Sequence, residues 1–391
     1  MSNDSAFIDK IVERVEISAK RVEEARTLPP EVYNSEEFFA FEKERLFYRE
    51  WLFVGHQGQI PNVGDAFPIE IVGEPVMVLR DETGKIRAYS AICPHRGFPI
   101  LSGAAHEKKN CLKLVCPYHR WGFDLNGQLL GAPHMNRTVD DDMLRQETHL
   151  KEFKLELVRG FIFISFADDP PPILPGLAKF AAHCENFQTE TLVPLPSMVQ
   201  TDLPFNWKIM HENALEPYHT LFVHDGFHDI APARLASFTD FDDGDLQIMH
   251  PTGFVPGGTG FSPMGTAFFP IIDTLSDQQK TEVMFGSAPP TMFFSFNPDH
   301  VFTFLILPQS ATTMTLITTM LLPRKTATMK NFEWAYGSYQ QTSRIIGQQD
   351  IDANTTMQQS LGSKFIKPGR YCQLETTLAQ FNRWLYLRYS S

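Results

Sequence analysis

The sequence has little of what extracellular, membrane-spanning or organelle-targeted proteins need. Its 391 residues include five cysteines, an odd number that argues against a disulfide framework and for a reducing compartment. The longest apolar runs, such as 160–167, are far too short to cross a bilayer. The first 26 residues lack an apolar signal-peptide core and are rich in acidic residues, which transit segments usually avoid. We therefore expect a cytoplasmic protein with no membrane partner.

Positive charge is scarce as well. Lysine and arginine number 34 against 46 acidic residues, which gives a formal net charge of −12. Because no basic stripe is present, we do not expect a nucleic-acid partner. The acidic surface could attract a basic docking partner, although simple solubility is the better explanation of this charge balance. A nicotinamide or flavin fingerprint is missing too, since Gly257, Gly258 and Gly260 lack the Gly-x-Gly-x-x-Gly spacing.

The chain is long enough for two or three domains, and 43% hydrophobic residues can bury a substantial core. Amphipathic patterns predict helices over 9–26 and 35–51, with Ser35 as the N-cap of the second. Short apolar runs with turn signals follow, and Asn126-Gly127 predicts a hairpin turn. We predict an α+β chain with N-terminal helices in 1–50, a small antiparallel β domain in 51–165, and an antiparallel sheet covered by helices in 166–391.

The second half mixes helical and strand patterns. A proline-rich loop over 168–175 precedes it. The later patterns predict a helix over 206–222 broken at Pro217, strands over 291–308 and 314–323, and helices over 332–361 and 373–389.

Two short motifs in the β domain each pair a cysteine with a histidine. They are Cys93-Pro94-His95 and Cys116-Pro117-Tyr118-His119. Four such ligands from two loops can hold either a zinc ion or a two-iron, two-sulfur cluster. Zinc fingers usually pair cysteine with cysteine and histidine with histidine, whereas here each loop offers one of each. In a Rieske cluster two cysteines hold one iron and two histidines the other, so each loop would supply one ligand to each iron.

These loops resemble those of the Rieske domain of ring-hydroxylating and related oxygenases, including the Arg-Gly after His95 and the Trp-Gly after His119. The resemblance implies a [2Fe-2S] cluster on Cys93, His95, Cys116 and His119. Such a cluster passes on single electrons from an external donor.

A second motif combines one carboxylate with two histidines. Glu216 and His219 are three residues apart, a spacing typical of one helix face. His224 follows five residues after His219, beyond the reach of one straight helical face. A local break in the helix must therefore bring its side chain to the same side as His219. Two histidines and one carboxylate on one side of Fe(II) form the facial triad of oxygen-activating enzymes, which leaves the opposite face open. Taken alone the motif is only moderately specific, because histidine pairs are often hydrogen-bonded core residues.

The stretch that begins at Asn206-Trp207-Lys208 resembles the iron-binding segment of the same oxygenases. The resemblance implies that His219 and His224 bind a mononuclear Fe(II). It also implies that Glu216 is not a ligand but bridges to a cluster histidine of the neighbouring subunit. Asn213 is a further candidate catalytic residue. His211, Asp225 and His228 crowd the same segment, either near the substrate or as ordinary hydrogen-bonded side chains.

In these relatives the ligand carboxylate comes from a C-terminal helix with an acidic pair. Asp350 fits best by its spacing to Gln358, and Asp352 is the alternative. The resemblance also implies a helix-grip-like catalytic domain and a head-to-tail homotrimer, in which the Rieske domain of one subunit lies at the iron of the next.

The function implied by the resemblance is that of a mono- or dioxygenase. It would use O2 and electrons from a separate reductase, which alone would handle NAD(P)H, to hydroxylate or oxidatively dealkylate a small organic substrate. The resemblance implies an aromatic acid or a methylated or quaternary amine as substrate. Glutamate at 216 is a hint toward the amine classes, because it also occurs in relatives of the choline, carnitine and glycine betaine group. A cis-dihydroxylating aromatic-ring dioxygenase is the alternative. A Rieske electron-transfer protein without oxygenase activity is the alternative of another class.

Overall fold

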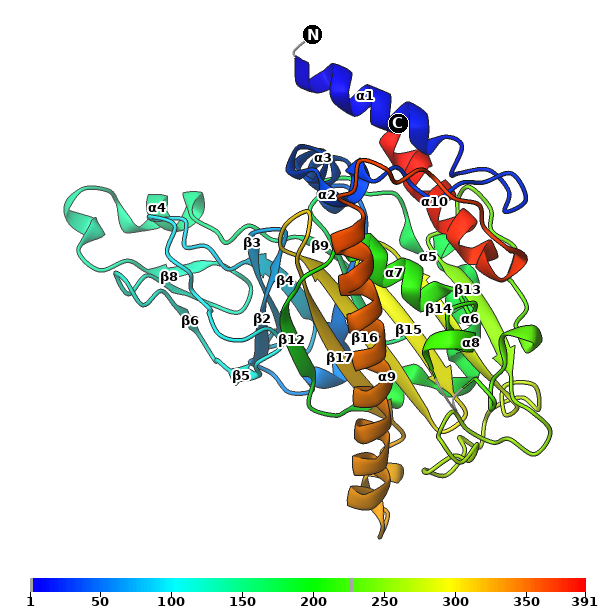
Figure 1. Cartoon of the computed structure of the whole chain (residues 1–391). Helices are drawn as coiled ribbons and strands as arrows, with labels where there is room; N and C mark the ends of the chain where they lie inside the picture. The colour runs from blue at the N-terminus through cyan, green and yellow to red at the C-terminus, as the bar shows by residue number, and fades with distance from the viewer. Residues whose placement is uncertain (1–2, 225–227) are drawn as a thin grey trace. The chain divides into compact units, whose positions relative to one another are not determined.

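The computed structural model describes residues 3–224 and 228–391 (Figure 1). The described chain forms two compact units. One is Tyr48–Pro171, and the other joins Met1–Phe47 to Pro172–Ser391. The N-terminal helices therefore belong with the C-terminal part of the chain and not with the segment that directly follows them.

Antiparallel sheets make up most of the unit Tyr48–Pro171. Their strand orders are β1-β10-β9, β4-β3-β2-β5 and β6-β7-β8. The strands are β1 (Leu52–His56), β2 (Asp65–Ile71), β3 (Glu74–Arg80), β4 (Ile86–Ser90), β5 (Lys109–Asn110), β6 (Leu114–Val115), β7 (Gly122–Phe123), β8 (Leu129–Gly131), β9 (Lys154–Val158) and β10 (Phe161–Ser165). One α-helix, α4 (Asp141–Glu147), follows β8.

The predicted hairpin turn at Asn126-Gly127 is confirmed between β7 and β8. Asp124 Oδ1 accepts hydrogen bonds from the backbone N–H groups of Asn126 at 2.9 Å and Gln128 at 2.8 Å. Gly127 has φ +79°, and a Cβ there would lie 2.9 Å from the Tyr89 ring. Glycine is therefore required both by the backbone conformation and by the close approach to the core.

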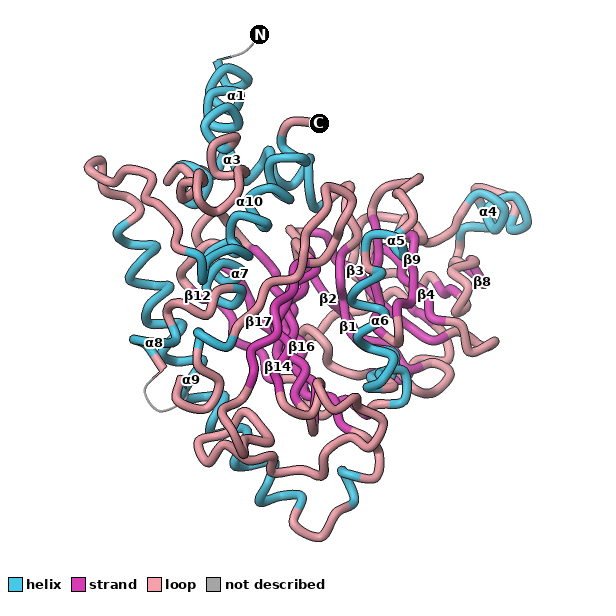
Figure 2. Tube along the Cα trace, turned by 90° about the vertical axis from the view of Figure 1, so that its right-hand side faces the viewer, coloured by secondary structure: helices cyan, strands magenta, loops and turns pink. Residues whose placement is uncertain are grey.

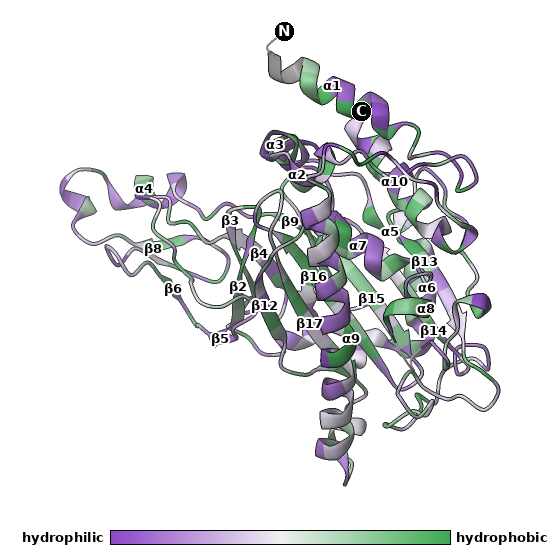
Figure 3. Cartoon of the chain, viewed as in Figure 1, coloured by the Kyte–Doolittle hydropathy of each residue, from purple (hydrophilic) through white to green (hydrophobic). Residues whose placement is uncertain are grey.

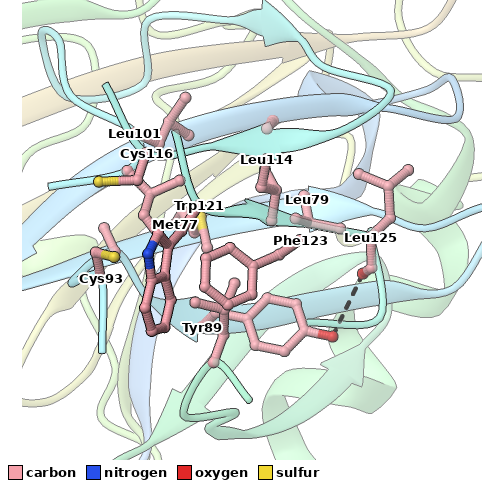
Figure 4. Close-up of a cluster of buried hydrophobic side chains, with 14 of the residues drawn as sticks. Met77, Leu79, Tyr89, Cys93, Leu101, Leu114, Cys116, Trp121, Phe123 and Leu125 are labelled. Carbon is pink, nitrogen blue, oxygen red and sulfur yellow. Dashed lines mark hydrogen bonds between the residues drawn. The ribbon is translucent and has the colours of Figure 1, made fainter. Parts of the chain in front are cut away.

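The core of this unit includes the cysteines of both motifs (Figure 4). Cys93 and Cys116 are 2% and 1% exposed and belong to the same cluster as Tyr89, Trp121 and Phe123. The rest of the cluster is aliphatic or aromatic, so the two loops are fixed by packing as well as by hydrogen bonds.

The larger unit is built on a seven-stranded antiparallel sheet, as far as the described residues show. Its order is β11-β17-β16-β15-β14-β13, with β12 also paired to β17. The strands are β11 (Val193–Pro194), β12 (Met198–Leu203), β13 (Ile248–Gly253), β14 (Glu282–Ala288), β15 (Met292–Asn297), β16 (His300–Pro308) and β17 (Met314–Leu322). The helices are α1 (Asn3–Val15), α2 (Glu31–Asn34), α3 (Glu36–Glu42), α5 (Ile173–Gly176), α6 (Ala178–Phe187), α7 (Trp207–Leu215), α8 (Thr220–Val223), α9 (Phe332–Ser360) and α10 (Thr376–Tyr389).

Helices cover both faces of this sheet. Figure 2 shows α7, α8 and α9 on one side of the strands and α6 on the other. Side chains alternate across the strands accordingly. On β15, Phe294 and Phe296 pack against Phe180 of α6, with ring centroids 4.9 and 6.0 Å apart. Their neighbours on the same strand face α7, α8 and α9, and they line the pocket described below.

The helix predictions are right in type but differ in extent. The helix predicted over 9–26 ends at Val15, and turns follow in which Val22 and Ala25 are still buried, against Ala379. The apolar residues after Val15 are buried by packed turns and not by a continuous helix. Ser35 is confirmed as an N-cap, because its Oγ accepts from the N–H of Phe38 at 3.1 Å. That helix ends at Glu42 and continues as a π-helix over Lys43–Phe47.

The strand predictions are confirmed, with 291–308 divided into β15 and β16 by a turn. β16 pairs with β17 from Val301↔Leu321 to Pro308↔Met314. In Figure 3 the central strands are mostly hydrophobic, whereas α9 alternates between hydrophilic and hydrophobic residues. Among the described helices, none combines the length and apolar character that a membrane span requires.

Candidate metal centres

The two cysteine–histidine loops have the same backbone fold. In each loop the cysteine N–H donates to the backbone carbonyl five residues later, and the cysteine C=O accepts from the backbone N–H four residues later. These two hydrogen bonds close a tight loop. The bonds are Cys93 N to Phe98 O (2.9 Å), Gly97 N to Cys93 O (3.0 Å), Cys116 N to Trp121 O (2.8 Å) and Arg120 N to Cys116 O (3.0 Å). Gly97 and Arg120 occupy the equivalent position and both have a left-handed backbone, with φ +74° and +62°.

The loops place like donors side by side. Cys93 and Cys116 are neighbours at the buried base, where burial chiefly, with help from the Cys116 thiol, raises the pKa of the Cys93 thiol. The rings of His95 and His119 lie 4.8 Å apart, partly exposed. Trp121 stacks on His95 at 4.6 Å with an interplanar angle of 7°. A sulfur pair beside an imidazole pair fits a two-iron cluster, in which each iron takes one kind of donor.

The second motif spans a helix break. Asn206 caps α7, with its side-chain oxygen accepting from Lys208 N at 2.9 Å. The helix ends at Leu215, because Pro217 cannot donate a backbone hydrogen bond. Glu216 and His219 thus do not share a helix face, which corrects the prediction from their spacing. His219 instead precedes α8, and His224 follows it.

The break brings both histidines to one carboxylate on α9. His219 Nε2 lies 3.1 Å from His224 Nε2 and 3.6 Å from Asp350 Oδ1. His224 Nε2 lies 3.1 Å from the same oxygen. These three ligand atoms all lie within 4.8 Å of one another. Two imidazoles and one carboxylate on a single side are the donor set of the facial triad.

Each imidazole is oriented by a hydrogen bond from its other nitrogen. His219 Nδ1 donates to Glu216 Oε1 at 2.7 Å, and His224 Nδ1 donates to Gln349 Oε1 at 3.0 Å. With the proton on Nδ1, both Nε2 lone pairs point toward each other and toward Asp350. Facing lone pairs at this distance repel unless a proton or a metal ion lies between them, and two imidazoles with one carboxylate fit a bound metal ion.

The carboxylates of Glu216 and Asp350 also shift the pKa of His219. Burial lowers the pKa of its imidazole, but the hydrogen bond and charge of Glu216, with a contribution from Asp350, leave this pKa raised overall. Asn213 Nδ2 donates to Asp350 Oδ1 at 3.2 Å, so this predicted residue lies at the site as well. Gln349 was not predicted, and its position beside Asp350 in the sequence was the available signal.

Other predicted residues lie apart from the triad. Asp352 Oδ1 accepts from Gln348 Nε2 at 2.8 Å on the exposed side of α9, so the structure brings Asp350 and not Asp352 to the histidines. His211 is fully buried and bonds Ser287 and the carbonyl of Pro290. His228 Nδ1 hydrogen-bonds Thr220 Oγ1, and His228 lines the same pocket as the triad. Asp225 lies outside the described residues.

Buried polar contacts hold α7 in place. Glu42 accepts hydrogen bonds from Lys208 Nζ at 2.8 and 2.9 Å, from Trp207 Nε1 at 3.3 Å, and from the hydroxyl of Tyr389. Lys208 and Glu42 are both inaccessible to solvent. The helix that precedes the triad is thus tied to the N-terminal and C-terminal helices by a paired charge.

A pocket opens from the triad along the sheet. α9 contributes one face of that pocket through Tyr339, Thr342, Ser343, Ile346, Gly347, Asp350 and Ile351. The sheet contributes aromatic walls, namely Phe285, Phe293, Phe302 and Phe304. Polar side chains of the sheet lie among them, including Gln200, Ser295, Asn297, His300 and Thr318. Among the described lining residues there is neither lysine nor arginine.

Comparison with known proteins matches both units. Residues 50–154 match the Rieske [2Fe-2S] domain model, and residues 189–391 match the model for the ring hydroxylating alpha subunit (catalytic domain). The carnitine monooxygenase oxygenase subunit of Escherichia coli (strain K12) is 34% identical over 211 residues, which are 53% of this chain and 54% of that protein. The glycine betaine monooxygenase oxygenase subunit of Chromohalobacter salexigens is 34% identical over 220 residues, 56% of this chain and 46% of that protein.

The match thus spans about half the length of these curated relatives. Two solved structures share the fold over nearly the whole chain. Naphthalene 1,2-dioxygenase from Rhodococcus sp. bound to indole has a TM-score of 0.79 at 20% identity and covers 100% of this chain and 98% of that one. The quaternary ammonium Rieske monooxygenase CntA with L-carnitine has a TM-score of 0.77 at 20% identity and covers 97% and 98%.

The predicted α+β fold class and the resemblance are thereby confirmed. The matched catalytic model alone covers more than half of the chain. The chain therefore belongs to the ring-hydroxylating alpha-subunit family, with a Rieske [2Fe-2S] domain ahead of its catalytic domain.

Proposed function

We propose that this chain is the oxygenase component of a Rieske non-haem iron system, which hydroxylates or oxidatively dealkylates a small organic substrate with O2. One observation carries the proposal: His219 Nε2, His224 Nε2 and Asp350 Oδ1 converge in the wall of a mainly apolar pocket. A ferrous ion held by these atoms would supply the reduction and activation of dioxygen. Cys93, His95, Cys116 and His119 would hold the [2Fe-2S] cluster that delivers the electrons.

The residues around the triad orient the donor atoms and the substrate. Glu216 and Gln349 hold protons on the Nδ1 atoms, so the Nε2 atoms are kept for the metal. Asn213 Nδ2 donates to Asp350 Oδ1 and helps to orient the carboxylate whose Oδ1 faces both imidazoles. The phenylalanine walls exclude water and hold the carbon to be oxidised against the open side of the triad.

Partners follow from the redox chemistry. A separate reductase would supply the electrons, since the sequence lacks a nicotinamide or flavin fingerprint. We propose a homotrimer in which Glu216 links the iron of one subunit to the cluster histidine of the next, because Glu216 lies 12% exposed beside His219. A cytoplasmic location is supported by the five cysteines, since no disulfide joins any of them in the described chain.

The substrate class follows from relatives and pocket together. The relatives named as carnitine and glycine betaine monooxygenase subunits favour a methylated amine, and phenylalanine faces can hold such cations by cation–π contacts. The same phenylalanine walls suit an aromatic ring, which favours ring dihydroxylation as the second candidate function.

Metal analysis and single-turnover chemistry test the proposal. Anaerobically reconstituted protein should show a red-brown Rieske spectrum and roughly three iron atoms per chain. His219→Ala should abolish turnover while the cluster spectrum stays intact. A colourless protein with zinc alone, or full turnover in the variant, would refute the assignment.

A further inference from the structure

The pocket has a second polar end, far from the triad. α9 carries both ends on one face, with Asp350 at the triad and Tyr339 eleven residues earlier (350 − 339). At 1.5 Å per residue, this separation is about 16 Å along the helix. Side chains at both ends shorten the free length, which leaves space on the order of 10 Å for an elongated ligand.

A buried carboxylate organises this far end. Asp299 is fully buried and accepts hydrogen bonds from His300 Nδ1 at 2.7 Å, Tyr339 Oη at 2.5 Å and the N–H of Phe269 at 3.0 Å. These bonds occupy both carboxylate oxygens and fix the His300 ring. Because Nδ1 is used in this way, Nε2 is the nitrogen that His300 has left for the pocket it lines.

Asn297 lies directly beside His300. The two residues are register partners at the end of the β15–β16 pair, so their side chains project from the same face of the sheet. Asn297 is 3% exposed and also lines the pocket. Its Nδ2 donates weakly to Ser295 Oγ at 3.4 Å, and its Oδ1 has no hydrogen-bond partner among the described residues. Leaving a buried amide oxygen without a hydrogen bond costs free energy, so a donor group on a ligand would stabilise Asn297 Oδ1.

The charge of this end selects against anions. Neither lysine nor arginine is among the described lining residues, and the buried Asp299 carboxylate lies behind His300. A ligand carboxylate would therefore add a second negative charge without a guanidinium or ammonium partner. With its proton on Nδ1, His300 Nε2 is an acceptor like Asn297 Oδ1. A hydroxyl can donate its one proton to Asn297 Oδ1, whereas a carboxylate has no proton to donate to either atom.

We propose that Asn297 and His300 form a specificity subsite for an uncharged hydroxyl head group. Of the two candidate functions above, this subsite favours the second, with an elongated, mainly aromatic alcohol or phenol as substrate, whose opposite end reaches the triad past Phe293, Phe302 and Phe304. This inference rests on the proposed function, because it assigns the substrate class of the same pocket.

Equilibrium dialysis with three matched probes tests the subsite on the metal-loaded protein, without reductase or turnover. The probes are 4-hydroxybiphenyl, biphenyl and biphenyl-4-carboxylate. We expect 4-hydroxybiphenyl to bind about tenfold more tightly than biphenyl, the ratio that one well-formed hydrogen bond gives. The carboxylate should bind most weakly. Equal binding of all three, tightest binding of the carboxylate, or no binding of any would overturn the proposal.

Variants test whether Asn297 causes the tighter binding of 4-hydroxybiphenyl. Asn297→Leu should remove most of the tenfold advantage of 4-hydroxybiphenyl while biphenyl binding is retained, and Asn297→Ser serves if the leucine variant does not fold. Thr303→Val is the matched control, because Thr303 is buried on β16 and bonds the carbonyl of Thr319 without lining the pocket. A preference that survives both Asn297 variants contradicts the subsite. Failed oxygenation with normal probe binding would refute the proposed function alone.

Discussion

Glu216 and His219 are joined twice across the break between α7 and α8. Glu216 Oε1 accepts from His219 Nδ1 at 2.7 Å, and Glu216 Oε2 accepts from the backbone N–H of His219 at 2.9 Å. One carboxylate thus orients the ring and also stabilises the backbone that the missing helix bonds would leave unpaired. Four residues lie between His219 and His224 in the sequence, and the contacts with Glu216 fix the position of His219.

Replacing Glu216 by glutamine tests the electron-transfer role that we propose for it. The amide oxygen can still accept from His219, so both metal centres should be retained, but the negative charge is lost. We expect single-turnover reoxidation of the cluster to slow by roughly 10- to 100-fold, the range for a residue that orients a metal ligand. Visible absorption after rapid mixing with O2 and substrate measures this rate. Glu375 lies close enough to Glu216 for their charges to interact, but its carboxylate accepts from the backbone N–H of Cys372 and not from His219. Glu375→Gln should therefore leave the rate near normal, and an unchanged rate in Glu216→Gln would contradict the bridging role.

The choice between the two acidic residues of α9 can be tested by iron content. Asp350→Asn should lose the mononuclear iron, because Asp350 Oδ1 faces both imidazoles at 3.1 and 3.6 Å. Iron should then fall from roughly three atoms per chain to about two, with an unchanged Rieske spectrum. Asp352→Asn is the matched control and should keep all of the iron. The reverse pattern would assign Asp352 as the ligand.

Gln349 should matter to iron affinity although it touches no ligand atom. Its Oε1 holds the Nδ1 proton of His224, so Gln349→Leu should weaken iron binding by roughly 10- to 100-fold. Competition with a chelator measures that affinity. Gln348→Leu removes the adjacent glutamine, which bonds Asp352 on the exposed side, and should have no effect. Equal affinities in the two variants would show that His224 needs no such support.

Glu212 should make the stability of the larger unit depend on pH. Burial raises the pKa of its carboxyl to about 7, against partial compensation by the Tyr33 hydroxyl at 2.6 Å and the charge of Lys208. Since the folded pKa exceeds the unfolded value, the folded state binds the proton more tightly. The contribution of the Glu212 proton to the free energy of unfolding is therefore full at acidic pH. This contribution, at most about 3 kcal/mol, is lost as the pH rises toward the folded pKa of about 7.

Glutamine at 212 provides the comparison for that pH dependence. Glu212→Gln keeps the acceptor for Tyr33 but has no proton to lose. The difference in denaturation midpoint between wild type and variant should therefore grow from pH 5 to pH 8, in favour of the variant. A difference that stays constant over this range would show that Glu212 does not titrate in the folded state.

Local motifs predicted much of the site. Cys93, His95, Cys116 and His119 occupy short loops whose shape depends on their own backbone bonds, so sequence was enough to pair them. The break at Pro217 was predictable for the same local reason. The N-terminal segment was less predictable: its apolar spacing is compatible with a long helix, and packing of Val22 and Ala25 against Ala379 decided for turns.

The sequence by itself determined the kinds of donor atom and the family, because these reside in residues that are close along the chain. Only the tertiary structure decided that Asp350 rather than Asp352 faces the histidines, since that depends on how α9 is rotated against α7 and α8. It also decided that Gln349 supports His224 and that Asn297 and His300 share the far end of the pocket. Contacts between distant segments follow from the packing of whole elements, and short-range patterns do not encode that packing.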